Sequence, residues 1–379
     1  FALLSSAQLA ALSTNQVQNI TAAQLGLLNS AQLQAISTAK ISSIEPADVA
    51  ALSSIQLRAL TTAQLAQFNA LQIAALSAET LARLSTAQVS AFATTPSSRL
   101  TTDQIGGIAA TSLDISAMNS VQVGALSTAQ VASLSTTQLV AFTALNIRGL
   151  SSRQLAAIAT DKISAIEVAD FGVLTSQQLP GLTTAQLRQV TTAQIAALGS
   201  LAVSGLTTAQ VNSLSTEAVG ALTSLSIVGL STTQLGVLAD VTALESADLQ
   251  AIKSSQLLGF TSTQLNQLTS LQLGALASSL IAGFSTAQIA AINSTQLARL
   301  PGSFLQGLTS SQVLSLATAN IQRLSTQALS EVQPSTLSYF STAQLQGLTT
   351  NQLVALSSVA LSGLGSAQVV GIDAAEIAS

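Results

Sequence analysis

The residues in this chain that could perform chemistry are carboxylates paired three residues apart. The pairs are Glu45 with Asp48, Glu167 with Asp170, Glu245 with Asp248, and Asp373 with Glu376. Two carboxylates at this spacing could coordinate calcium, which prefers oxygen ligands, or could act in general acid–base catalysis. The first turn of a helix also favours negative charge, because of the helix dipole. This helix-start interpretation is the simpler one. We therefore expect no metal site, and keep only the first three pairs as candidate calcium ligands.

Other catalytic arrangements lack their essential residues. The chain contains no His, which excludes a Ser-His-Asp triad despite the many hydroxyl groups. Its only lysines are Lys40, Lys162 and Lys253, and none stands in a convincing Ser-x-x-Lys phrase. Without His or Cys, haem and transition metals lack their usual ligands, and Met118 and Tyr339 alone do not make a site. We expect no catalytic residue, no cofactor and no enzymatic activity.

The elements that position these residues come from an eight-residue repeat, here called the octad. From Leu182 the chain reads Leu-Thr-Thr-Ala-Gln-Leu-Arg-Gln and then Val-Thr-Thr-Ala-Gln-Ile-Ala-Ala, up to Leu198. Position one is a large apolar residue, position two Ser or Thr, position five Gln, and position six apolar. Ser or Thr followed three residues later by Gln is a capping box, and the apolar residues at positions one and six form a hydrophobic staple. Each octad therefore predicts the start of a new helix at position two.

Proline and glycine support this register. Pro46 and Pro334 fall at position three, the first helical residue, where proline is favoured. Glycines recur at position eight, where a short helix must end, and there they predict a left-handed helix end. These glycines are Gly149, Gly205, Gly229, Gly259, Gly283, Gly307 and Gly363.

One octad is too short to fold alone, since isolated helices below roughly 12 residues are marginal in water. Octads must therefore coil and stack, which predicts an all-α solenoid with one very short helix per octad. The position-eight glycines recur every three or four octads, which indicates about three octads per superhelical turn. Large residues at position four share this rhythm, and we expect them to fill one corner of each turn. They are Leu71, Val121, Leu145, Leu201, Leu225 and Val359. Duplication of a multi-octad block would give the same rhythm without geometric meaning.

A β-solenoid is the alternative fold, because a period of eight is compatible with strand alternation. Positions one and six would, however, face opposite sides of a strand, and Ala and Gln are poor strand formers. The octads keep one register from Leu4 to Ile108, from Met118 to Leu238, and from Leu244 to Ile372. The sequence predicts one continuous solenoid over residues 1–379, with register breaks near 108–118 and 238–244.

The amino-acid composition limits which binding partners and which cellular location are expected for the protein. The 379 residues carry 11 basic and 15 acidic side chains, a net charge of −4. No basic patch is present, so we expect no nucleic-acid binding. Mean hydropathy is +0.54, but no run approaches the 18 or so apolar residues of a membrane span. Low charge and abundant Ser, Thr and Ala suit an extracellular or cell-surface protein. The chain starts without Met and in mid-octad, so we expect it to be a segment of a longer or processed chain.

The Leu-Thr-Thr-Ala-Gln and Leu-Ser-Thr-Ala-Gln phrases resemble those of very long, secreted bacterial repeat proteins of the surface, adhesin-like or extracellular-filament type. The resemblance covers essentially the whole chain. It implies a structural role in an extracellular filament or surface fibre, with other copies of the chain as partner, joined end to end or laterally. It carries no site residues. The alternative is an adhesin stalk or a module that binds ice or glycans through rows of hydroxyl groups, with glycans or a cell surface as partner.

Overall fold

The computed structural model describes residues 1–93, 104–105, 108 and 113–372. All regular elements among these residues are short helices, and none is a strand. The all-α prediction is therefore confirmed, and the β-solenoid alternative is wrong. Within this described part, no helix is long and apolar enough to span a bilayer.

The described residues form two compact units, Phe1–Val190 and Thr191–Ser379. The helices of unit 1, with 3-10 helices marked η, are α1 (Ser6–Ala10), α2 (Thr14–Gln18), α3 (Ala22–Gly26), α4 (Ser30–Ala35), η1 (Thr38–Ser43), α5 (Pro46–Val49), α6 (Ser54–Ala59), α7 (Thr62–Leu65), α8 (Ala70–Ala75), α9 (Ala78–Leu81), α10 (Thr86–Ala93), η4 (Ile115–Ala117), α12 (Ser120–Gly124), α13 (Thr128–Ser133), α14 (Thr136–Val140), η5 (Ile147–Gly149), α15 (Ser152–Ala157), η6 (Thr160–Ala165), α16 (Val168–Phe171), η7 (Leu179–Gly181) and α17 (Thr184–Leu187).

The helices of unit 2 are α18 (Thr192–Ala196), α19 (Ser200–Val203), α20 (Thr208–Asn212), α21 (Thr216–Gly220), α22 (Ser224–Ile227), α23 (Thr232–Gly236), η8 (Val241–Ala243), α24 (Ser246–Ala251), α25 (Ser254–Leu257), α26 (Ser262–Gln267), α27 (Ser270–Gly274), α28 (Ser278–Ile281), α29 (Thr286–Ala290), α30 (Ser294–Leu297), α31 (Gly302–Gln306), α32 (Ser310–Ser315), α33 (Thr318–Ile321), α34 (Thr326–Ser330), α35 (Pro334–Leu337), α36 (Thr342–Gln346), α37 (Thr350–Ala355), α38 (Ser358–Leu361) and α39 (Ser366–Gly371).

Most helices begin at the predicted capping box. In α17, the Thr183 hydroxyl accepts from the Gln186 amide N–H at 3.1 Å, and Gln186 Oε1 accepts from the Thr183 amide N–H at 2.7 Å. Pro46 and Pro334 occupy the first turns of α5 and α35, as expected. Position two therefore starts most of the described helices, whereas η5 and η7 begin after position five, with Asn146 and Gln178 as N-caps.

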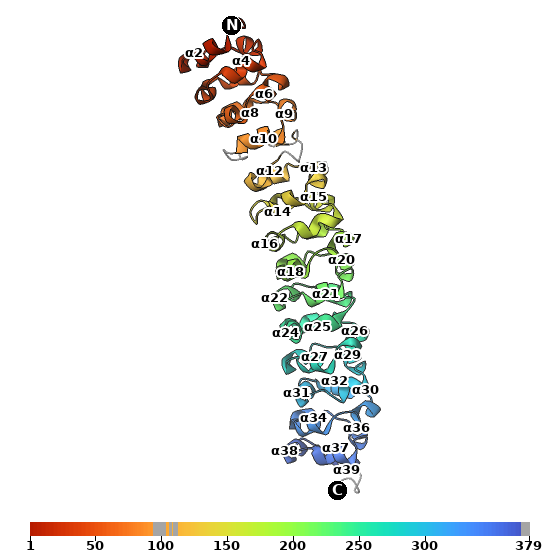
Figure 1. Cartoon of the computed structure of the whole chain (residues 1–379). Coiled ribbons are helices and arrows are strands. Elements are labelled where there is room, and N and C mark those ends of the chain that lie inside the picture. The colour runs from red at the N-terminus through yellow and green to blue at the C-terminus, as the bar shows by residue number, and fades with distance from the viewer. Residues whose placement is uncertain (94–103, 106–107, 109–112, 373–379) are drawn as a thin grey trace. The chain divides into compact units, whose positions relative to one another are not determined.

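Within each unit, helices stack on the helix three octads later (Figure 1). In unit 1, α1 begins at Ser6 and packs against α4, which begins at Ser30, a separation of 24 residues. In unit 2, α31 begins at Gly302 and packs against α34, which begins at Thr326, again 24 residues on. A turn of about three octads, here called a coil, is confirmed. Positions one and six face its interior: Leu182 is 2% exposed and Leu187 1%.

Glycine at position eight has a different reason from the one predicted. No described glycine has a positive φ, so the left-handed helix end is wrong. Instead, the backbone of the preceding coil lies against the glycine. A Cβ added to Gly229 would lie 2.0 Å from the Ser200 carbonyl oxygen, and one added to Gly363 would lie 2.1 Å from that of Pro334. These glycines allow neighbouring coils to approach closely.

The large residues at position four also differ from expectation. Leu71 is 71% exposed, Leu145 83% and Leu201 77%, so they do not fill a corner of the coil. Position four is the second helical residue. It lies two residues before the buried position six, which is roughly 200° away around a helix. The side chain therefore points to solvent.

Only the second of the two predicted register breaks lies fully within the described residues. The first falls partly on residues 109–112, outside the described residues. At the second, the shortened step contains η8, where Asp240 Oδ1 accepts from the Thr242 amide N–H at 2.9 Å. Hydroxyl groups of Thr242 and Thr216 lower the pKa of Asp240. The boundary between the two units coincides with neither break. One continuous body over residues 1–379 stays a prediction.

The glycine contact predicts the effect of a methyl group. Gly229→Ala should destabilise unit 2 by about 1–3 kcal/mol, because the new Cβ would collide with backbone that has little room to move. Gly199→Ala is the matched control, since nothing lies within 4 Å of its added Cβ. Urea unfolding of both variants checks this. Equal stability losses in the two would contradict the close-approach explanation.

Candidate functional site

The surface between successive coils is built by the glutamine at position five. In α7, Gln64 Oε1 accepts from the Thr61 amide N–H at 3.0 Å, which closes the capping box. Its Nε2 group donates to the carbonyls of Leu33 at 3.0 Å and Ile36 at 2.9 Å, one coil earlier. Gln64 is only 1% exposed. The side-chain amide of Gln64 thus caps the start of its own helix and donates hydrogen bonds to the carbonyls at the end of another helix.

This geometry follows from helix polarity. Position five is the third helical residue, so its side chain turns back past the start of its own helix. There it meets the last carbonyls of a helix in the preceding coil, which have no partner within that helix. Other glutamines that donate to both equivalent carbonyls include Gln56, Gln72, Gln104, Gln130, Gln154, Gln178, Gln186, Gln264, Gln288, Gln296, Gln312, Gln344 and Gln352.

Other hydrogen-bond donors make this contact in some octads, whereas other octads carry a residue without a side-chain donor at position five, such as Ala202 or Phe304. Asn146 Nδ2 donates to the carbonyls of Ile115 at 2.8 Å and Met118 at 3.1 Å. Lys162 Nζ donates to the Leu134 carbonyl at 2.9 Å. Lys40 Nζ donates in the same way to the Leu12 carbonyl. The capping box is predictable from the sequence, but this second contact joins different coils and is not part of that short-range signal. The replacement of Gln by Asn and Lys, which share only their donor groups, was the signal that could have revealed it.

The paired carboxylates lie where the helix-start interpretation placed them. Glu45, Glu167 and Glu245 are N-cap residues, and Asp48, Asp170 and Asp248 follow at position five. The part of the chain that the structure describes contains no group of three or more His, Cys, Asp or Glu side chains suited to a metal ion. Asp373 and Glu376 lie outside the described residues. The expectation of no metal site, with the three pairs as candidate calcium ligands, stays a prediction.

Two of these aspartates are buried at a position that in most octads carries a glutamine as donor. Asp170 is 5% exposed and Asp248 4%. Burial, and then the charge of Glu167, raise the pKa of Asp170. Burial likewise raises the pKa of Asp248, whose carboxylate accepts from the Glu245 amide N–H at 3.2 Å. Because a carboxylate cannot donate, these octads are weak points in the contact between coils.

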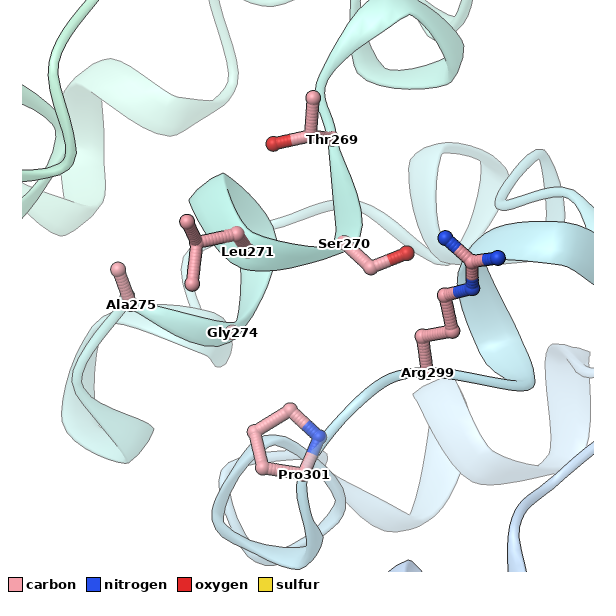
Figure 2. A pocket seen from close by; sticks show the side chains of 7 residues that line it. All are labelled: Thr269, Ser270, Leu271, Gly274, Ala275, Arg299 and Pro301. Carbon is pink, nitrogen blue, oxygen red and sulfur yellow. The ribbon is translucent and has the colours of Figure 1, made fainter.

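A hollow of about 550 Å³ opens on the surface of unit 2 between α27 and the start of α31. Figure 2 shows its lining, with the Arg299 side chain extending toward Ser270, and Pro301 below Gly274. Its residues are Thr269, Ser270, Leu271, Gly274, Ala275, Arg299 and Pro301. The lining offers one cation, two hydroxyl groups and apolar surface, but no carboxylate to act as a general base. Sequence reasoning missed this hollow, because its parts come from octads about 30 residues apart.

Comparison with known proteins supports a repeat protein. Four segments of the chain, residues 41–78, 111–144, 163–200 and 241–278, are similar to the ALTTAQ repeat. No curated protein sequence matches the chain significantly. The repeat model and the stacked short helices together indicate a helical, solenoid-like repeat protein.

The glutamine contact predicts a large effect from a small change. Gln288→Glu keeps an oxygen for the capping box but removes the donor and places a carboxylate against the carbonyls of Leu257 and Phe260. The cost should reach about 3 kcal/mol, since buried charged groups without partners are expensive. Gln267→Glu, on an exposed side chain of the same unit, should cost less than about 1 kcal/mol. Amide hydrogen exchange across α25–α29 measures the loss of stability in both variants. Similar protection in the two variants would show that the donor is dispensable.

The burial of Asp170 predicts that replacing it with a neutral residue increases stability by an amount that depends on pH. Because the pKa of Asp170 is higher in the folded state, its negative charge opposes folding at neutral pH, and this penalty disappears below its ordinary pKa of 3.8. Asp170→Asn should therefore stabilise unit 1 by about 1–3 kcal/mol near neutral pH, with a donor placed as in Asn146. The gain should shrink as the pH falls toward 3.8. Thermal unfolding against pH measures it, with exposed Asp161→Asn as control. A gain that is constant with pH would rule out the charge as its cause.

Proposed function

We propose that this chain is a structural segment of an extracellular bacterial filament or surface fibre, assembled by stacking solenoid coils, and that it is not an enzyme. The observation that carries the proposal is the glutamine contact between coils. It recurs along both units with the same atoms, and it joins buried backbone rather than variable surface side chains. Such a contact adds the same increment of stability with each further coil.

The contact has a direction. Each coil presents amide donors toward the preceding coil and helix-end carbonyls toward the following one. A head-to-tail contact of this kind does not close on itself in a pair and instead generates open filaments. In the polypeptide of residues 1–379, Gln8 and Gln16 of the first coil are exposed and close only their own capping boxes. The same contact would form with a further coil of a longer chain or with a second copy.

The absence of catalytic arrangements fits this role. The octad hydroxyl groups at position two are engaged in capping, and the hollow in unit 2 has no carboxylate in its lining. An extracellular location accords with the low charge and with the resemblance to secreted repeat proteins.

Electron microscopy of the polypeptide of residues 1–379 at increasing concentration tests the proposal. We expect filaments of uniform width. Gln8→Glu combined with Gln16→Glu should reduce filament formation while leaving the helical circular dichroism unchanged, because both side chains are exposed. The control is Gln267→Glu, which should still form filaments. Dispersed short particles at every concentration would refute assembly through the ends.

An adhesin stalk or an ice- or glycan-binding module is the second candidate, and the exposed hydroxyls at position three favour it. Thr208 and Thr232 are exposed on α20 and α23, which pack in neighbouring coils. A row of hydroxyl groups therefore runs across successive coils. Thermal hysteresis and binding to a glycan panel measure this function. Their joint absence would remove it.

A further inference from the structure

The hollow in unit 2 is held open by contacts between coils. The buried Gln296, three residues before Arg299, donates to the carbonyls of Leu265 at 2.8 Å and Leu268 at 2.6 Å, which fixes α30 against the preceding coil. Gly274 makes room for the ring of Pro301, because a Cβ at Gly274 would lie 2.9 Å from Pro301 Cδ. The packed backbone of the two coils thus supports the exposed side chains that line the hollow.

Arg299 is the only charged group in this lining. It is exposed, and the structure shows no ion pair for it with any described carboxylate. An adjoining depression of about 390 Å³ shares Thr269, Ser270 and Arg299 and adds further amide and hydroxyl groups. These groups belong to Asn266, Asn293 and Thr295, whereas the buried Gln296 amide is already engaged with the carbonyls of Leu265 and Leu268. In a chain with few charges, this places one guanidinium at the centre of a neutral, hydrogen-bonding surface.

We propose that this hollow binds a carboxylated saccharide, with a hexuronate unit as the recognised group. The Arg299 guanidinium matches one carboxylate through paired charge-assisted hydrogen bonds. Thr269, Ser270 and the neighbouring amides suit the sugar hydroxyls. Leu271, which is 79% exposed, and Pro301 offer an apolar surface to the C–H face of the ring.

The composition of the hollow favours this ligand class over other anions. A phosphate or sulfate group with two charges would meet only one cation here, whereas a hexuronate carries a single charge surrounded by hydroxyl groups. An apolar ligand would leave the guanidinium and the amides without partners, which costs free energy. The inference is independent of filament assembly, since the residues that line the hollow do not include Gln8 or Gln16.

Arg323 provides a matched control. It stands at the same octad position as Arg299, 24 residues later, and is also exposed. It belongs to neither the hollow nor the adjoining depression. Arg323→Gln therefore removes the same charge and the same side chain from the same unit without touching the proposed site.

Isothermal titration of the full chain with trigalacturonate tests the proposal, and its methyl-esterified form and inorganic phosphate serve as comparison ligands. Trigalacturonate should bind, the ester should bind at least about tenfold more weakly, and phosphate should not compete. Arg299→Gln should weaken binding about tenfold or more, while Arg323→Gln should leave it unchanged. Unchanged circular dichroism confirms that both variants fold. No binding by the unaltered chain, equal binding by Arg299→Gln, or equal binding of the ester would overturn the proposal. Filament formation by Arg299→Gln should persist, which separates this test from that of the proposed function.

Discussion

The architecture depends on one amide group that satisfies three backbone groups at once. At position five, Oε1 accepts from the N-cap amide while Nε2 donates to two carbonyls of the preceding coil, as in Gln64. Helices of four to six residues leave most of their backbone groups without internal partners, so their ends dominate their energetics. The glutamine side chain provides hydrogen-bond partners both for the N-cap amide of its own helix and for the last carbonyls of a helix in the preceding coil. This contact helps such short helices persist in a chain that has no cysteine to form disulfides.

The glycine contacts complete this arrangement on another edge of the coil. Where position eight carries Gly229 or Gly363, the backbones of two coils come too close for any side chain. Glutamine and glycine thus contribute to different contacts between successive coils. Glutamine forms hydrogen bonds, and glycine leaves space for the backbone of the neighbouring coil. The interior is left to the apolar residues at positions one and six, which need only size and hydrophobicity. This division explains why Leu, Ile, Val and Phe interchange there while glutamine recurs.

The local structure was predictable from the sequence because the capping box is a short-range signal. Thr183 and Gln186 are three residues apart, and their reciprocal bonds follow from helix geometry alone. The coil of three octads was predictable from the spacing of the glycines. The true reason for Gly229 and the second bond of Gln64 were not, because each depends on backbone about 28–31 residues away. The outward direction of Leu71 and Leu145 follows from local helix geometry, and the glycine rhythm led to the wrong expectation for them. The hollow at Arg299 was hidden for the same reason, since its walls meet only after coiling.

The short reach of these contacts has a mechanical consequence. The bonds that join coils span about 22 to 31 residues, so each coil depends on its immediate neighbours and on nothing more distant. Under tension, the chain would yield one coil at a time instead of failing as a whole. A coil of 24 residues pulled straight supplies up to about 80 Å of length. When the load falls, the coil can wind back onto an intact neighbour that serves as its template. A fibre built in this way would absorb sudden force by lengthening and would recover its shape afterwards.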